Sequence, residues 1–423
     1  MRSAGLKTRY LIPIGLFVAS LASPFVFAHD GLLHVDEKVL FPIGFYHFPD
    51  DESVATRMAE SGVNLVHTGN VAELDRAEAH GIYGWLTLPM HVSLDASGRE
   101  RITEAAKHPA LAVWEGPDEL VWNFTAFSGL FRDGTHEMKN AWWAQTPNSV
   151  AFAENRAAEI MPNIHDWVAA IREIDGNKRP VWFNEAYKSD TAYVRQYMDV
   201  VDITGCDLYP VKSVGRPIAN VGPYTERFNL VGEGKPVWMV LQAFSWHEVK
   251  KDEGLPEAYP TFAESRFMAY DAIAHGATGI LYWGSAYTTN EPFLESLYAV
   301  TRELATLQPF LVTPEQEEVS IRLIEAPAPE PQRGVAHIAR SNNTDSLIVL
   351  INEDNIGHMG IEVNGLTALE GKTLYQYDGA ERVVVENGRF LTRLQPLETK
   401  VFGTNFQHSD ALPTGRDFGV TQE

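Results

Sequence analysis

Three carboxylates crowd one short segment of the chain, VWEGPDEL at residues 113–120. Glu115 precedes a Gly-Pro break, and Asp118 and Glu119 follow it. Neighbouring carboxyl groups raise one another's pKa, which lets one of them hold a proton and act as a general acid. Adjacent residues of a regular strand point to opposite faces, so Asp118 and Glu119 enter one site only if the chain bends at the Gly-Pro break.

Apolar strand-like runs alternate with helix-like stretches on both sides of this segment. Such alternation predicts a parallel α/β fold, and eight units in about 280 residues predict a (β/α)8 TIM barrel. An open doubly wound sheet would carry a Gly-rich turn after its first strand, and FYHFPDD at residues 45–51 has no glycine. The eight predicted strands span residues 40–46, 63–67, 83–88, 111–114, 180–183, 203–208, 236–241 and 279–283.

Helices are predicted between these strands. Several of them end just before a glycine, the residue that most often terminates a helix. The predicted helices include residues 52–61, 71–80, 157–174 and 262–275, followed by Gly62, Gly81, Gly176 and Gly276.

The C-terminal ends of the strands form the active face of such a barrel, and here their side chains are acidic and aromatic. Cleaving a glycosidic bond needs one carboxyl group to protonate the leaving oxygen, a second to attack carbon or activate water, and flat rings to stack on the sugar. The sequence therefore predicts Glu119, Asp118 and Glu185 as catalytic candidates. The predicted substrate-binding residues are Tyr46, His67, Glu115, Trp122, Asn184, Asp207, Tyr209, Gln242, Trp246, Tyr282 and Trp283.

A long insertion follows the fourth strand, at residues 121–149, and is expected to be a loop enlarged over the active face. Its tryptophans Trp122, Trp142 and Trp143 are predicted to stack on sugars together with Trp246 and Trp283. The histidines nearest this region lie on separate elements without metal-ligand spacing, so neither a metal nor a cofactor is predicted. These histidines are His67, His247 and His275.

This layout resembles the large clan of (β/α)8 glycoside hydrolases that place an Asn-Glu pair after strand four and carry a C-terminal β-domain. The resemblance implies that Glu119 is the acid/base and that Asp118 replaces the asparagine that contacts the sugar 2-substituent. DLYP at residues 207–210 and LYWG at residues 281–284 are similar to segments of those enzymes. Trp283 would then be the platform beneath the reacting sugar.

The chain departs from that clan at strand seven, where the clan has its nucleophilic glutamate and this sequence has Gln242. An amide cannot act as the carboxylate nucleophile, and three explanations stay open. The nucleophile or base lies on another strand end, with Glu185 and then Asp207 as candidates. Alternatively, the substrate supplies a 2-acetamido group polarised by Asp118, as in family 20 hexosaminidases, or the barrel binds glycans without cleaving them.

The first 28 residues have the pattern of an export signal. Basic residues precede an apolar run at residues 11–27, and Val26, Phe27 and Ala28 fit a small-x-small cleavage site. We expect a periplasmic or extracellular protein that begins at His29 and lies off the membrane after cleavage. Cys206 is the single cysteine, which excludes an intrachain disulfide.

Charge narrows the expected partners. The formal net charge is −22, from 56 acidic and 34 basic residues, and the basic residues form no stripe. Nucleic acid and anionic membrane surfaces repel such a chain. The expected partner is a carbohydrate substrate, and a neutral one suits the net charge best.

The pattern changes from about residue 318, where short strand-like alternations follow one another without helices. This change predicts a C-terminal all-β sandwich domain. The predicted organisation is a signal at 1–28, a catalytic barrel at 29–315, the sandwich at 316–404 and a loose polar tail at 405–423.

Overall fold

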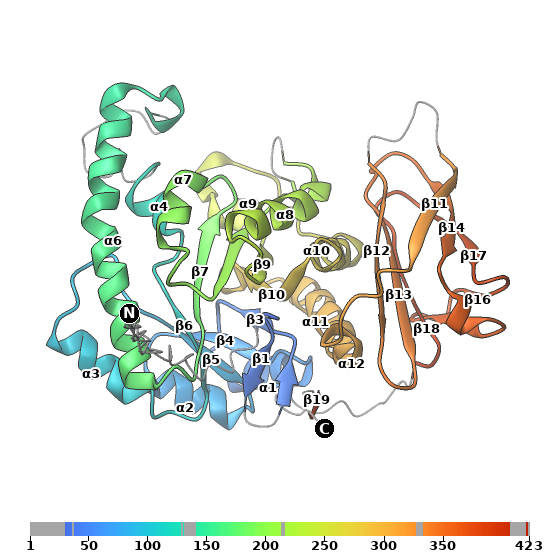
Figure 1. The fold of residues 1–423 in the computed structure, drawn as a ribbon, viewed down its shortest axis with the longest axis horizontal. Helices are drawn as coiled ribbons and strands as arrows, with labels where there is room; N and C mark the ends of the chain where they lie inside the picture. The colour runs from blue at the N-terminus through green and yellow to red at the C-terminus, as the bar shows by residue number, and fades with distance from the viewer. Residues whose placement is uncertain are drawn as a thin grey trace, which may run out of the picture.

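The computed structural model describes residues 30–35, 38–127, 130, 141–212, 216–326, 333–406 and 420–421. A closed barrel of parallel strands and two packed antiparallel sheets form the fold, which confirms the predicted (β/α)8 barrel followed by a β-sandwich (Figure 1). The barrel strands follow chain order around the ring, and the last pairs with the first. They are β3 (Ile43–Phe45), β4 (Leu65–Thr68), β5 (Tyr83–Thr87), β6 (Leu111–Glu115), β7 (Val181–Ala186), β8 (Ile203–Asp207), β9 (Val237–Gln242) and β10 (Ala277–Trp283).

Helices cover the outside of the barrel. Helix α6 begins ten residues before the predicted start, because Thr146 caps it by accepting a hydrogen bond from Ser149 N, and Pro147 suits its first turn. It ends at Gly176, whose φ of 67° is readily adopted by glycine. The α-helices are α1 (Glu52–Glu60), α2 (Val71–Ala79), α3 (Ala96–Ala105), α4 (Leu120–Phe124), α6 (Pro147–Asp175), α7 (Thr191–Val194), α8 (Val221–Val231), α9 (Trp246–Val249), α10 (Phe262–Ala274), α11 (Glu291–Thr306) and α12 (Gln308–Leu311).

Tryptophan rings fill the barrel interior. Trp85, Trp182 and Trp238 are fully buried and lie in one cluster with leucine and valine side chains. Glycine at position 205 makes room for them, because a Cβ there would lie 2.3 Å from the Trp238 carbonyl oxygen. The lower part of the barrel is therefore a packed core, and chemistry is confined to its mouth.

A short hairpin contacts this core. It comprises β1 (Leu33–Val35) and β2 (Lys38–Leu40), and its Leu33 and Leu40 join the tryptophan cluster. Strand β19 (Val420–Thr421) pairs with β2, a contact that the polar sequence of residues 405–423 does not predict. The predicted signal at residues 1–28 lies outside the described residues. No helix of the described ranges has the length and apolar character needed to cross a membrane.

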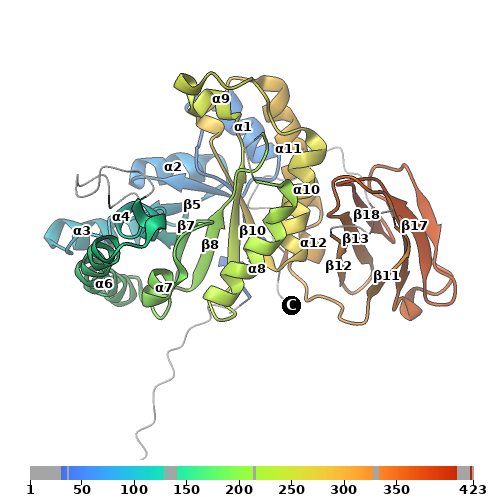
Figure 2. The same cartoon turned by 90° about the horizontal axis from the view of Figure 1, so that it is seen from above.

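Helix α6 and the β-sandwich lie on opposite sides of the barrel (Figures 1 and 2). One sheet of the sandwich contains β11 (Ser320–Glu325), β14 (Met359–Asn364) and β17 (Phe390–Leu394). The other contains β12 (Val335–Ser341), β13 (Ser346–Asn352), β18 (Thr399–Gly403), β15 (Thr373–Gln376) and β16 (Arg382–Val384).

Strand β13 joins the two domains, because both of its faces are buried. Ile348 and Leu350 point into the sandwich core, whereas Leu347, Val349 and Ile351 belong to the cluster that contains the barrel helices. This double burial explains the uninterrupted apolar run SLIVLIN.

Candidate active site

The chain after β6 carries one extra residue beside β7. Gly116 N donates to Trp182 O at 3.0 Å, and the next bond along the strand runs from Glu119 N to Asn184 O, also at 3.0 Å. Regular pairing advances two residues on both strands, but here one strand advances three. This bulge breaks the in-and-out alternation at the Gly-Pro break, so the adjacent acids Asp118 and Glu119 can reach neighbouring parts of one site.

The backbone of Glu119 lies in the left-handed region, with φ 47° and ψ 52°. That conformation is uncommon for residues other than glycine and costs on the order of 1 kcal/mol, and strained residues cluster at functional sites. Glu119 precedes α4, yet its side chain caps no backbone amide of that helix. Its carboxyl group instead accepts a hydrogen bond from Asn123 Nδ2 at 3.1 Å.

Glu185 lies away from the catalytic cavity, which corrects its prediction as a nucleophile or base. Trp182 and Asn184 point into the barrel, so Glu185 points outward and is fully buried against α4 and the segment after α7. Its carboxylate accepts hydrogen bonds from Val121 N at 2.9 Å, Ser189 Oγ at 2.6 Å and Tyr197 OH at 2.7 Å. Glu185 thus anchors the N-terminus of α4, the helix that follows Glu119.

Glu119 and Asp207 form a carboxyl pair. Their side chains share a hydrogen bond, which requires a proton on one of them. Burial, followed by the charge of Asp207, raises the pKa of Glu119 far above its usual range. Burial and the charge of Asp118 also raise the pKa of Asp207, which accepts hydrogen bonds from Glu119 and from Tyr209 OH at 3.1 Å. The arrangement favours a protonated Glu119 beside an ionised Asp207.

A second polar layer lies beneath this pair. Tyr46 OH donates to Glu115 Oε1 at 3.0 Å and lies 3.5 Å from Asp118 Oδ1, which also accepts from Asn184 Nδ2 at 2.9 Å. Glu115 receives two further bonds, from Trp85 Nε1 and Thr87 Oγ1. Burial and the charge of Asp118 nevertheless raise the pKa of Glu115 to about 8.

His67 completes this layer. Its Nε2 lies 2.9 Å from Thr87 Oγ1, and its ring stacks on that of Tyr46. Tyr46, His67, Glu115, Asp118 and Asn184 are therefore brought together as predicted. They support the carboxyl pair from below, and none of them lines the cavity.

A cavity of about 180 Å³ opens above the carboxyl pair. The rings of Tyr209 and Trp283 stack on its wall with their centres 5.3 Å apart. Six predicted residues meet here, which gives the cavity an acidic floor and aromatic walls. The lining comprises Glu119, Trp122, Ala186, Tyr187, Asp207, Tyr209, Arg216, Trp246, Val249 and Trp283.

Gln242 and Tyr282 do not belong to this cavity, which corrects their prediction as substrate-binding residues. The Gln242 amide is fully buried, donates to Val211 O and Phe244 O, and accepts from Val211 N. Tyr282 is also fully buried and packs on Phe45 in the layer between barrel and helices. Gln242 thus holds the segment after β8 against the segment after β9.

The insertion divides its tryptophans between two roles. Trp142 is buried against Tyr193, so its predicted role in sugar stacking is wrong. Trp143 is 47% exposed and lies beside Trp122.

Four further residues of the site were not predicted. Thr87 ends the third strand, for which no candidate was named, and Asn123 follows Glu119 at the i+4 spacing of a helix, so both carried a usable signal. Tyr187 and Arg216 lie on loops after β7 and β8, where no pattern marks them.

No family model matches the chain, and no curated protein matches it. Solved structures share its fold. A protein described as a glycoside hydrolase has a TM-score of 0.54 at 13% identity, over 89% of this chain and 97% of its own. A glycoside hydrolase family 5 protein from Bacteroides vulgatus has a TM-score of 0.54 at 12% identity, over 92% and 98%. A catalytic mutant of a GH42 beta-galactosidase from G. stearothermophilus has a TM-score of 0.53 at 10% identity, over 86% and 98%. These identities establish a shared fold, and the predicted resemblance to (β/α)8 glycoside hydrolases is confirmed at that level.

Proposed function

We propose that the chain is a glycoside hydrolase that cleaves O-glycosidic bonds of an oligo- or polysaccharide. The observation that carries the proposal is the hydrogen-bonded carboxyl pair of Glu119 and Asp207 beneath an aromatic-lined cavity. The cavity lies at the C-terminal mouth of the barrel, where barrels of this kind place their chemistry. The glycoside hydrolases among the structures that share the fold add support.

Glu119 protonates the leaving oxygen in this mechanism, because burial and Asp207 keep its proton in place near neutral pH. Asp207 attacks the anomeric carbon as its bond to the leaving oxygen breaks, and a covalent glycosyl ester forms. Glu119, now ionised, removes a proton from a water that cleaves the ester and restores both groups.

The contact between the two carboxyl groups supports net retention of configuration. Inverting enzymes keep their carboxyl groups roughly 6.5–9.5 Å apart to hold a water, whereas retaining pairs are roughly 5–5.5 Å apart. Side chains that share a hydrogen bond leave no room for an intervening water. Proton NMR of the first product anomer tests this point, and an initial product of opposite configuration would exclude Asp207 as nucleophile.

The other two explanations of Gln242 have less support. Asp118 is hydrogen-bonded to Asn184 below the cavity, which is a poor position for polarising an acetamido group of a substrate. The amide of Gln242 supports backbone outside the cavity, so its presence removes no nucleophile from the site.

Hydrolysis of a broad panel of α- and β-linked glycans, including 2-acetamido sugars, tests the proposal. We expect the wild type to cleave at least one member, and Glu119→Gln and Asp207→Asn to reduce kcat by about 10²–10⁴-fold. Glu100→Gln, at an exposed position on α3, is the matched control. Unchanged turnover in Glu119→Gln would contradict the proposal. Tight glycan binding without cleavage by wild type would identify a binding protein.

We also propose that the chain is exported and cleaved after Ala28. N-terminal sequencing of the protein recovered outside the cytoplasm should begin at His29. An intact N-terminus on the active protein would contradict this proposal.

A further inference from the structure

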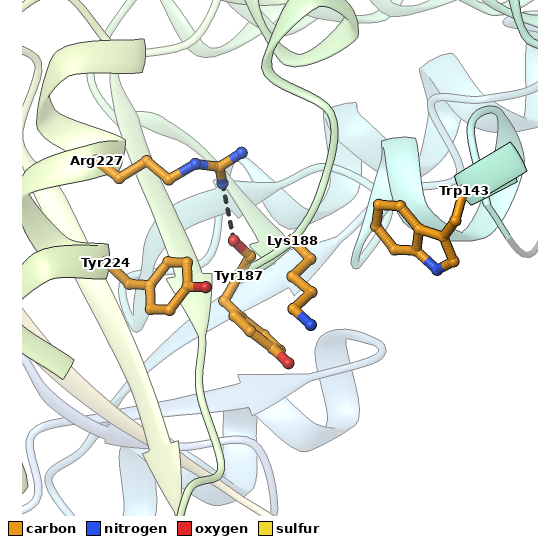
Figure 3. A pocket seen from close by; sticks show the side chains of 5 residues that line it. All are labelled: Trp143, Tyr187, Lys188, Tyr224 and Arg227. Carbon is orange, nitrogen blue, oxygen red and sulfur yellow. Dashed lines mark hydrogen bonds between the residues drawn. The ribbon is translucent and has the colours of Figure 1, made fainter. Parts of the chain in front are cut away.

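A second pocket opens beside the catalytic cavity, and Tyr187 lines both. This adjoining pocket has a volume of about 480 Å³ and is lined by Trp143, Tyr187, Lys188, Tyr224 and Arg227 (Figure 3). That volume lies within the range of small-molecule sites. A chain of sugars that enters the catalytic cavity can therefore extend into the adjoining pocket.

Aromatic rings form its apolar surfaces. Tyr187 and Tyr224 meet edge to face with centres 4.9 Å apart, and Trp143 stands on the opposite side of the pocket in the view of Figure 3. Trp143 is 47% exposed, although its size and apolar character favour burial. A half-exposed indole beside a pocket offers a face on which a sugar ring can stack.

Three cations surround Tyr187. Lys188 Nζ lies 5.4 Å from the centre of the Tyr187 ring, and the Arg216 guanidinium lies 5.0 Å from it. Arg227 donates through Nη1 to Tyr187 O at 2.8 Å and through Nη2 to Ser189 O at 3.0 Å, as Figure 3 shows for Tyr187. These carbonyl groups hold the guanidinium in place without neutralising its charge.

None of these three cations is paired with a carboxylate within the described part of the chain. This is unusual in a chain with 56 acidic and only 34 basic residues, where acidic partners are abundant. Arg57, by comparison, contacts both Glu291 and Glu295. The charge of Arg216 lowers the pKa of Asp207, which places Arg216 between the two cavities.

We propose that the adjoining pocket binds a sugar unit that carries a carboxylate or sulfate group, so that the substrate is an acidic glycan. The ligand's being a glycan rests on the proposed function, whereas its negative charge rests on the unpaired cations. Lys188 and Arg227 would contact the anionic group, and Trp143 or Tyr187 would stack on its ring. The net charge of −22 favours neutral ligands for the molecule as a whole, but the local charge of this pocket reverses that preference.

Calorimetric titration tests the inference independently of catalysis. The probes are three tetrasaccharides of equal length, namely tetragalacturonate, a chondroitin sulfate tetrasaccharide and a neutral galactan tetrasaccharide. We expect one acidic probe to bind at least tenfold more tightly than the neutral probe, and which one it is distinguishes carboxylate from sulfate. Lys188→Gln should weaken binding of that probe about threefold to tenfold and leave the neutral probe unaffected.

Lys107→Gln, an exposed lysine after α3, is the matched control and should change neither affinity. Equal affinity for neutral and acidic probes would overturn the inference, as would equal loss of both in Lys188→Gln or no binding of either acidic probe at millimolar concentration. Cleavage of neutral glycans without acidic preference would leave the proposed function intact. Selective acidic binding without cleavage of any glycan would leave the pocket intact and refute the hydrolase.

Discussion

Carboxylates are buried at two places in this molecule, and different groups face them. Where the barrel meets the β-sandwich, Glu303 is 5% exposed and accepts hydrogen bonds from Arg266 Nε and Nη2 at 2.8–3.0 Å. At the barrel mouth, Glu119 faces Asp207, and Asp118 lies close enough to raise the pKa of both. Opposite charges stabilise the first place, whereas like charges disfavour folding at the second. Burial of like charges has no structural benefit, and it is the arrangement that acid–base catalysis requires.

Removing the cation at the domain boundary should have the largest effect on stability. Arg266→Met leaves Glu303 buried without its partner, and we expect the free energy of unfolding to fall by about 3–5 kcal/mol. Denaturant titration measures the loss. Arg57→Met is the matched control, because Arg57 pairs with exposed glutamates, and it should cost less than about 1 kcal/mol. Equal losses in the two variants would show that burial does not distinguish the boundary pair.

Converting Gln242 to the clan's glutamate should destabilise the protein without improving it. Gln242→Glu places a carboxylate oxygen where the amide now donates to Val211 O and Phe244 O. We expect a loss of about 2–3 kcal/mol and no gain in turnover, measured by denaturant titration and by initial rates. A variant with raised activity would show that this position can supply the nucleophile.

The carboxyl pair should respond in the opposite sense. Glu119→Gln keeps the shape of the side chain and removes one member of a like-charged, buried pair, so we expect stability to rise by about 1 kcal/mol while activity falls. Thermal unfolding of wild type and variant measures this difference. A variant that is both inactive and clearly less stable would indicate that Glu119 has a structural role.

The smallest effect concerns pH at the domain boundary. Burial lowers the pKa of His275, but the hydrogen bond to Glu353, the charge of Asp271 and the bond to Glu226 raise it to about 9. Arg333 is the cation near this group. A raised pKa in the folded state means that this stabilisation is present below the unfolded value of about 6.5 and is lost as pH rises through about 9.

His275→Gln should therefore lower the unfolding temperature by a few degrees at pH 6 and have little effect at pH 10. Thermal unfolding at both pH values measures the effect. An equal decrease at both pH values would contradict a role for the imidazolium charge.

The sequence predicts the barrel well, because eight apolar runs separated by capped helices leave few alternatives. It predicts the carboxyl cluster around Glu119 for the same reason, since the Gly-Pro break supplies the bulge. It misplaces Glu185 and Tyr282, each of which is adjacent to an inward-facing residue. Strands of a parallel barrel are buried on both faces, so their apolar pattern does not show which of two neighbours points inward.

The cations of the adjoining pocket could not be predicted for another reason. Lys188 and Arg216 lie on loops after different strands, and Arg227 lies on α8. Only the closed barrel brings them around Tyr187. Their convergence is a property of the fold, and the net charge of the sequence points to the opposite kind of ligand.

Difference infrared spectroscopy tests the carboxyl pair most directly and requires no substrate. The spectrum of wild type minus that of Glu119→Gln at neutral pH isolates the C=O stretch of a protonated Glu119 carboxyl group. We predict a positive band in the protonated-carboxyl region, which shifts on exchange into deuterated water and persists until Glu119 loses its proton at alkaline pH. Absence of that band would show that Glu119 is ionised beside Asp207, and an ionised Glu119 could not serve as the general acid.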